Sequence, residues 1–153
     1  KKMGISPTEL TAKEYILITK FAPLVCVDAI VIYQGRVLLC KRSIKPALGK
    51  WALPGGRLYK GEKLISGVIR KVKEEVGLVF TDIEFLRIDE VFYHEYHAVT
   101  HIYTGLGSGL ISIDKSQFSD YCLASTIPGN CEETVVRSLQ QFFMMLEGEY
   151  HGI

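Results

Sequence analysis

The residues best suited to chemistry lie between positions 56 and 78, where glycines, an arginine and carboxylates recur at fixed intervals. Positions 71, 74 and 75 share an arc of about 100° on one side of a helix that turns by about 100° per residue. Glu74 and Glu75 are therefore expected to face a common polar cleft. Carboxylate oxygens suit Mg²⁺, which keeps several waters and bridges to substrate phosphates. The preceding Gly55 and Gly56 let the backbone approach a metal or a phosphate closely.

An ordinary solvated helix surface would carry similar charges. Arg70 and Glu74 stand four residues apart, as do Lys71 and Glu75. Such pairs stabilise a helix by only ~0.3–0.5 kcal/mol. The helix charges alone therefore leave both a functional and a surface role open.

One strongly patterned helix is predicted to carry these charges. It spans residues 62–76 and ends at Gly77, a residue that suits the stop of a helix. Its apolar residues recur at helical spacing and form one stripe, made of Ile65, Val68, Ile69, Val72 and Val76. The stripe predicts that the helix packs on a core and turns its carboxylates away from it.

Further elements surround this helix in the sequence. A capping box of Thr11 and Glu14 predicts a helix over residues 12–20, and a second box of Asn130 and Glu133 predicts a helix to residue 146. Segments rich in β-branched and aromatic residues predict strands at 24–33, 36–41, 51–53, 83–96 and 99–106. This order predicts an α+β fold, an α/β/α sandwich with a mixed β-sheet between helices.

Composition limits the class of protein. With 153 residues, 48% of them hydrophobic, the chain is expected to form a single domain over residues 1–153. The net charge of +1 argues against a nucleic-acid-binding face. No apolar stretch reaches the ~18 residues of a membrane span, and the N-terminal residues lack an apolar signal core. We therefore expect a cytoplasmic protein with no membrane partner. Its four cysteines, without a Cys-x-x-Cys pair, are expected to be reduced and structural.

The segment from Gly56 to Leu78 resembles the signature box of the Nudix hydrolases. The matching positions are Gly56, Glu62, Arg70, Val72, Glu74, Glu75, Gly77 and Leu78. The departure is Lys71, where the family carries a metal-binding glutamate. Like charges at ~4 Å repel by about 4 kcal/mol at an effective dielectric of 20, so a site with several Mg²⁺ ions is not expected. Either one metal remains, or Lys71 pairs with Glu75 and metal binding is lost.

One branch of that family, the GDP-mannose mannosyl hydrolases, lacks the same glutamate. The chain resembles this branch in the stretch 41–57, which holds Pro-Ala, Gly, Trp and Pro-Gly-Gly-Arg in the same arrangement. It is also similar in residues 23–28 and 100–103. The resemblance implies an enzyme that uses one Mg²⁺ and cleaves the sugar C–O bond of GDP-mannose, and it implies a homodimer.

The resemblance also implies roles for individual residues. The Gly55 carbonyl and Glu75, with Glu74 beside it, would hold Mg²⁺ or Mn²⁺. Arg42 and Arg57 would bind the diphosphate, and Asp28 and Tyr103 would contact the substrate. His101 would be the general base, with His94 and His97 as rivals. A histidine has a pKa that suits this task at neutral pH.

Two other functions stay open. A Nudix pyrophosphatase would use the same box to cut the P–O bond of the diphosphate. A non-catalytic nucleotide-binding or regulatory domain would keep the fold with degraded metal chemistry. The aromatic residues Phe92, Tyr93 and Tyr96 either stack on a base or line a sheet.

Overall fold

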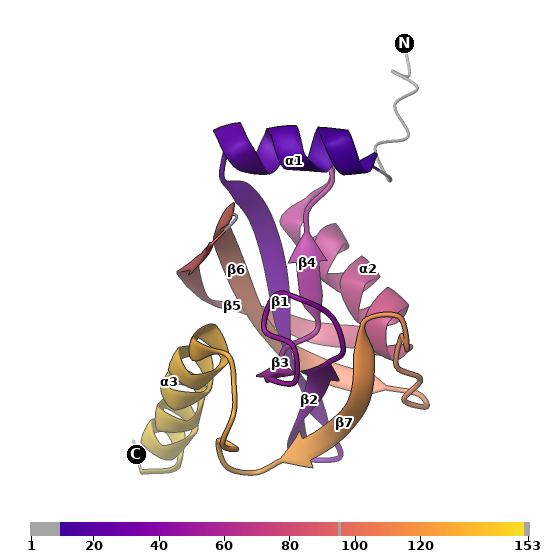
Figure 1. Ribbon diagram of the computed structural model, residues 1–153. Coiled ribbons are helices and arrows are strands. Elements are labelled where there is room, and N and C mark those ends of the chain that lie inside the picture. The colour runs from indigo at the N-terminus through magenta and orange to yellow at the C-terminus, as the bar shows by residue number, and fades with distance from the viewer. Residues whose placement is uncertain (1–9, 95, 152–153) are drawn as a thin grey trace.

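A computed structural model describes residues 10–94 and 96–151 of the chain (Figure 1). In chain order the elements are α1 (Ala12–Phe21), β1 (Leu24–Tyr33), β2 (Arg36–Arg42), β3 (Trp51–Ala52), β4 (Gly55–Arg57), α2 (Leu64–Val76), β5 (Val79–Tyr93), β6 (Tyr96–Ser108), β7 (Phe118–Ala124) and α3 (Glu133–His151). The predicted domain over residues 1–153 also includes residues 1–9, 95 and 152–153, which lie outside the described residues. None of the described helices is long and apolar enough to cross a membrane.

The strands form one mixed sheet in the order β3-β2-β1-β6-β5, with β4 added beside β1 and β7 beside β2. The long central pairing of β1 with β6 is parallel, whereas the other pairings are antiparallel. On its other edge β1 changes partner along its length. Its residues 26–28 pair with β4, and its residues 32–33 pair with β2. The sheet therefore forks between β4 and β2.

The two faces of the sheet carry separate cores. On one face, Val68, Val72 and Val76 of α2 pack on strand residues such as Val27 and Val31. On the other face, α3 packs on a second cluster with its buried residues Val135 and Leu139. Figure 1 shows α2 and α3 on opposite sides of the sheet, with α1 across one end of it. The predicted α/β/α sandwich with a mixed sheet is confirmed.

The main helix differs from its prediction at one end and on one side. It begins at Leu64 rather than at residue 62, and it ends at Gly77 as predicted, in a left-handed conformation with φ of 74°. Ile65 and Ile69 are 43% and 39% exposed, although the apolar stripe included them. Gly67 and Glu75 are buried instead. The buried side of α2 therefore includes Glu75, a carboxylate that the sequence pattern placed in a polar cleft.

Other elements were predicted in part. The capping box of Thr11 and Glu14 is confirmed by two hydrogen bonds, of 3.1 and 3.2 Å. The box of Asn130 and Glu133 is wrong, because α3 begins at Glu133 and the Asn130 amide donates to the Gly49 carbonyl at 3.0 Å. Strands β4 and β7 were missed, and the predicted strand over 83–96 instead turns after residue 93. β4 holds only three residues, two of them glycine, and such a segment carries no strand pattern.

Candidate active site

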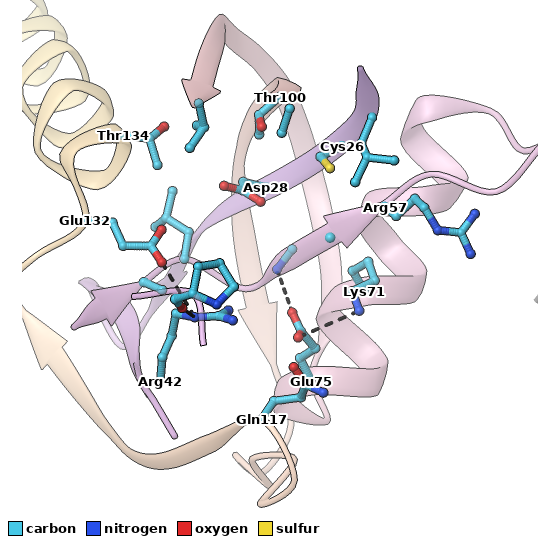
Figure 2. A pocket seen from close by; sticks show the side chains of 18 of the residues that line it. Cys26, Asp28, Arg42, Arg57, Lys71, Glu75, Thr100, Gln117, Glu132 and Thr134 are labelled. Atoms are coloured by element: carbon cyan, nitrogen blue, oxygen red, sulfur yellow. Dashed lines mark hydrogen bonds and ion pairs between the residues drawn. The ribbon is translucent and has the colours of Figure 1, made fainter. Parts of the chain in front are cut away.

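A cavity of about 360 Å³ opens at the fork of the sheet. Because β4 and β2 diverge there, side chains from both faces reach the same space. Glu75 comes from α2 on one face. On the other face, Glu132 directly precedes α3 and Thr134 lies in its first turn (Figure 2). The cavity brings together most of the residues predicted for the site, namely Asp28, Arg42, Gly55, Arg57, Glu74 and Glu75.

Glu75 is the buried carboxylate of this cavity. It sits in the last turn of α2 with only 4% of its surface exposed. The Gly55 amide donates a hydrogen bond of 2.6 Å to its Oε1 atom, and so the last turn of α2 is tied to β4. Burial raises the pKa of Glu75 to about 7, although the Lys71 ammonium, the Gly55 N–H and Arg42 act in the opposite direction. A carboxylate of this kind is stabilised by any further cation that enters the cavity.

Lys71 supplies a cation from within the same helix. Its Nζ atom lies 3.7 Å from Oε2 of Glu75 and 3.8 Å from Oε2 of Glu74. These separations are ion-pair distances and exceed those of a hydrogen bond. The predicted pairing of Lys71 with Glu75 is therefore present. Oε2 of Glu75 has no hydrogen bond among the described residues and keeps lone pairs for another ligand.

Arg70 holds the loop before α2 rather than facing the cavity. Its guanidinium donates two hydrogen bonds to the Glu62 carboxylate, of 2.7 and 2.9 Å. It also donates to the Arg57 carbonyl at 3.1 Å and lies 3.7 Å from the centre of the Tyr59 ring. Two residues at fixed positions of the sequence pattern, Glu62 and Arg70, therefore shape the loop between β4 and α2.

Gly55 allows the closest approach of backbone to side chain in the site. It pairs with Asp28 across β1 and β4. A Cβ atom at position 55 would collide with Oδ1 of Asp28, with the Val27 carbonyl, and with Cα of Asp28 at 2.8 Å. Only glycine fits here without displacing β1, and the Gly55 amide is thereby brought to Glu75.

Asp28 projects from β1 into the cavity and is half-buried. Loss of water raises the pKa of Asp28 well above its ordinary value, and the nearby Glu132 and Glu75 carboxylates raise it further. Arg42 and Lys71 partly offset this effect. A carboxyl group that faces a cavity in this state suits contact with a hydroxyl or an exchange of protons.

Arg42 stands at the end of β2, where the strand leaves the sheet. Its Nε atom donates to the Pro46 carbonyl at 2.5 Å and lies 3.7 Å from Oε1 of Glu132. Glu132 directly precedes α3 and also accepts a hydrogen bond from the Tyr93 side chain. Burial raises the pKa of Glu132, whereas Arg42 and Tyr93 lower it. Arg42 is thus oriented at the cavity wall by the loop that follows it.

Arg57 reaches the cavity only with part of its side chain. Figure 2 shows its guanidinium directed away from Asp28 and Glu75. The group lies 5.2 Å from the centre of the Tyr59 ring. A rotation about its side-chain bonds is needed before Arg57 contacts a ligand beside Glu75.

The predicted base and the predicted tyrosine lie elsewhere. Thr100 faces the cavity, so His101, the next residue of β6, points to the opposite side of the sheet. Its Nδ1 atom lies 3.4 Å from the Cys26 carbonyl. Tyr103 is only 5% exposed within the core under α2, with its ring edge against Phe85. Neither placement supports the predicted role, because neither side chain lines the cavity.

The rival histidines also lie outside the cavity. His97 pairs with Glu90 at 3.0 Å and stacks on the Phe92 ring. His94 lines a separate groove beside α1. Tyr93 and Tyr96 do line the cavity, so the predicted aromatic cluster divides between a cavity wall and the sheet surface.

The donor set fits one divalent cation rather than a cluster. The described residues contain no group of three or more His, Cys, Asp or Glu side chains placed to share a metal. Mg²⁺ is commonly held by one or two carboxylates together with substrate phosphates and water. Glu75 and Glu74 supply such carboxylates at one end of the cavity, next to the backbone of Gly55. The number of metal ions stays a prediction.

Several lining residues were missed from the sequence, among them Cys26, Thr100, Gln117, Glu132 and Thr134. Cys26 could have been found, because it stands two residues before Asp28 on the same strand. Thr100 could not, because its place depends on the register of β6 with β1. Glu132 and Thr134 carried no such signal, since they reach the cavity only through the packing of α3.

Comparison with known proteins identifies a family and its fold. A family model described as the NUDIX domain matches residues 23–126. The MutT NUDIX hydrolase from Burkholderia pseudomallei superposes with a TM-score of 0.73 at 25% identity, over 78% of this chain and 97% of that one. The NUDIX domain of Shewanella oneidensis NrtR, complexed with ADP ribose, gives a TM-score of 0.69 at 28% identity, over 90% and 99%.

Curated relatives are similar over shorter segments. The low-salt glycan biosynthesis protein Agl8 of Haloferax volcanii is 37% identical over 86 residues, 56% of this chain and 55% of that protein. An ADP-ribose pyrophosphatase of Methanocaldococcus jannaschii is 44% identical over 57 residues, 37% of this chain and 34% of that protein. The matched segments thus span about half or less of the relatives' own length.

Proposed function

Because the chain belongs to the Nudix family, we propose that it is a Mg²⁺-dependent hydrolase of a nucleoside diphosphate sugar of the GDP-mannose type. The observation that carries the proposal is the shared cavity, in which the buried Glu75 carboxylate and the Arg42 and Lys71 cations meet at the fork of the sheet. The relative named for glycan biosynthesis favours a sugar-bearing substrate.

The diphosphate is expected to lie at the α2 end of the cavity. Arg42 and Lys71 offer positive charge there, and Arg57 adds a third cation once it turns from Tyr59. Arginine is suited to this task because its planar guanidinium donates two parallel hydrogen bonds to phosphate oxygens. The sugar would then lie toward Asp28, Thr100 and Glu132, whose oxygens accept from hydroxyl groups.

Glu75 and Glu74, with the Gly55 carbonyl, would hold a single Mg²⁺, or Mn²⁺ in its place. When bound, such an ion neutralises charge that develops on the diphosphate leaving group. The residues of the chain contribute the rest: Arg42 orients the diphosphate, and the Gly55 amide keeps Glu75 aimed at the cavity.

In the proposed reaction, the oxygen of a water molecule bonds to the anomeric carbon, and the C–O bond to the diphosphate breaks. The diphosphate leaves with the bonding electron pair, and the water gives up a proton. Since His94, His97 and His101 do not line the cavity, a carboxylate takes that proton. Asp28 and Glu132 are the two carboxylates at the sugar end, and they replace His101 in the proposal.

A second candidate function is binding without hydrolysis. It is favoured by the pairing of Lys71 with both carboxylates of α2 and by the absence of a histidine from the cavity wall in the described part of the chain. A third candidate is a pyrophosphatase, which the name of one relative favours.

One experiment separates the three candidates. The protein is incubated with Mg²⁺ and GDP-mannose in ¹⁸O-water, and the products are followed by phosphorus NMR and mass spectrometry. GDP with unlabelled phosphates and an ¹⁸O-labelled sugar is the expected result. GMP and a sugar phosphate would replace it with the pyrophosphatase. Intact substrate across a panel of nucleotide sugars, with binding retained, would leave the binding function.

The contribution of the cavity is tested with a matched pair of variants. Arg42→Gln removes a cation from the cavity wall, whereas Arg36→Gln removes one from the exposed start of β2. We expect the first variant to lower kcat/KM by about 10²-fold, as for the loss of a group that stabilises developing charge. The kcat/KM of the second variant is expected to stay within about twofold of the wild-type value, because surface charges contribute little.

A further inference from the structure

The carboxylates at the end of α2 are paired with a lysine of the same helix. Lys71 lies within 3.8 Å of both Glu74 and Glu75, and its side chain crosses the face of Gly56, where an added Cβ atom would lie 2.8 Å from its Cε atom. Lys71 is half-buried, and its side chain is only 19% exposed. The ammonium group is therefore held in the site rather than free in solvent.

The charges at this end of the cavity nearly cancel. Glu74 also pairs with Arg70, whose Nη1 atom lies 3.1 Å from its Oε2 atom. Arg70 shares its charge with Glu62, which accepts two of its hydrogen bonds. Within the cavity, Glu74, Glu75 and Asp114 stand near Lys71 and Arg42, so a free divalent cation meets only a small excess of negative charge. A diphosphate that enters beside Lys71 and Arg42 adds several negative charges to the same space. Only then does the cavity carry the excess of negative charge that a divalent cation requires.

We propose that Lys71 makes metal binding depend on the diphosphate, so that the divalent cation enters together with the nucleotide and not before it. This inference rests on the proposed diphosphate site, but not on the bond that is cleaved. Two binding sites coupled in this way must act reciprocally. The nucleotide raises the affinity for the metal, and the metal raises the affinity for the nucleotide by the same factor.

Direct metal binding tests the proposal. Mn²⁺ is titrated into the nucleotide-free protein, and free Mn²⁺ is measured by electron paramagnetic resonance. We expect weak binding to the wild type and binding at least about tenfold tighter to Lys71→Gln and to Lys71→Met, within the range of known couplings between sites. The methionine variant keeps the aliphatic chain over Gly56, so that it separates the loss of charge from the loss of packing.

Lys73→Gln is the matched control. This lysine lies on the same helix, two residues away, but is exposed and outside the cavity. Its removal changes the net charge of the protein equally and is expected to leave Mn²⁺ affinity within about twofold. If all three variants bind Mn²⁺ like the wild type, or if the nucleotide-free wild type already binds it as tightly as its complex with GDP, the proposal is overturned.

Calorimetry with GDP completes the test. GDP is titrated into the wild type with saturating Mn²⁺ and, separately, with EDTA, after correction for the Mn²⁺–GDP complex in solution. We expect at least about tenfold tighter binding with the metal, and a smaller ratio for Lys71→Gln. Equal affinities, or no binding of GDP in either condition, would contradict the proposal. Neither measurement needs turnover, so a failure to hydrolyse GDP-mannose would refute the proposed function alone.

Discussion

Glu62 occupies a fixed position of the sequence pattern, but it holds Arg70 and does not line the cavity. Its carboxylate accepts two hydrogen bonds from Arg70 and one from the Tyr59 amide. The bonds from Arg70 are the main cause that lowers the pKa of Glu62 below its ordinary value of 4.5. Stability from this contact is therefore present above pH 4.5 and is lost as the pH falls through the lowered pKa.

Glu62→Gln is expected to lower the free energy of unfolding by roughly 1.5 kcal/mol at neutral pH, because hydrogen bonds to a charged group are lost. The difference from wild type should shrink as the pH falls through the lowered pKa of Glu62, because the wild-type carboxylate then becomes protonated itself. Urea unfolding at several pH values measures it. Glu84→Gln, on the exposed side of β5, serves as the control. A difference that stays constant with pH would show that the charge of Glu62 does not matter.

At the scale of single residues, the sequence predicted the types of side chain well and their directions less well. The helix period placed Glu74 and Glu75 side by side, and the resemblance supplied Arg42; all three line one cavity. His101 and Tyr103 failed for one shared reason. Side chains of a strand alternate between faces, and no sequence pattern stated which parity of β6 would face the cavity.

At the scale of elements, β4 determines the site although it has three residues. It pairs with residues 26–28 of β1 and presents the Gly55 amide to Glu75. The Pro-Gly-Gly sequence predicts no strand at this point, since glycine and proline are rare in strands. The structure instead uses glycine here because no side chain fits against Asp28.

Gly55→Ala tests this close approach. The added methyl group would collide with Asp28 and with the Val27 carbonyl, so we expect a loss of at least about 2 kcal/mol in the free energy of unfolding. The affinity for GDP should fall with it. Gly129→Ala is the matched control, because a Cβ atom there meets nothing within 4 Å. Similar stability of the two variants, measured by urea unfolding, would mean that β4 moves without cost.

At the scale of the whole molecule, the sandwich has a core on each face of the sheet, and the second core depends on α3. Leu139 is fully buried there, whereas Met144 on the same helix is 69% exposed. Leu139→Ala is expected to cost ~2–5 kcal/mol of unfolding free energy. Met144→Ala should change it by less than about 0.5 kcal/mol. Equal costs in urea unfolding would show that α3 does not pack on the sheet as described.

The class of fold followed from the order of predicted elements, because alternating strands and two strong helices allow few layered arrangements. The fork of the sheet could not be predicted in the same way. It depends on which strands pair with β1, and these pairings join residues distant in the sequence. Glu132 and Thr134 reach the cavity wall through the packing of α3, which also joins distant parts of the chain. The homodimer and the cytoplasmic location stay predictions.

The divided edge of β1 has a practical consequence. In the described part of the chain, β4 and β2 each pair with β1 but not with each other, and the wall therefore contains a seam. A compound that touches Gly55 on one side and Arg42 on the other bridges this seam. At a concentration of a hundred times its dissociation constant, such a compound would add ~2.7 kcal/mol to the free energy of unfolding. A shift in melting temperature thus detects occupants of the cavity, whether or not the protein transforms them.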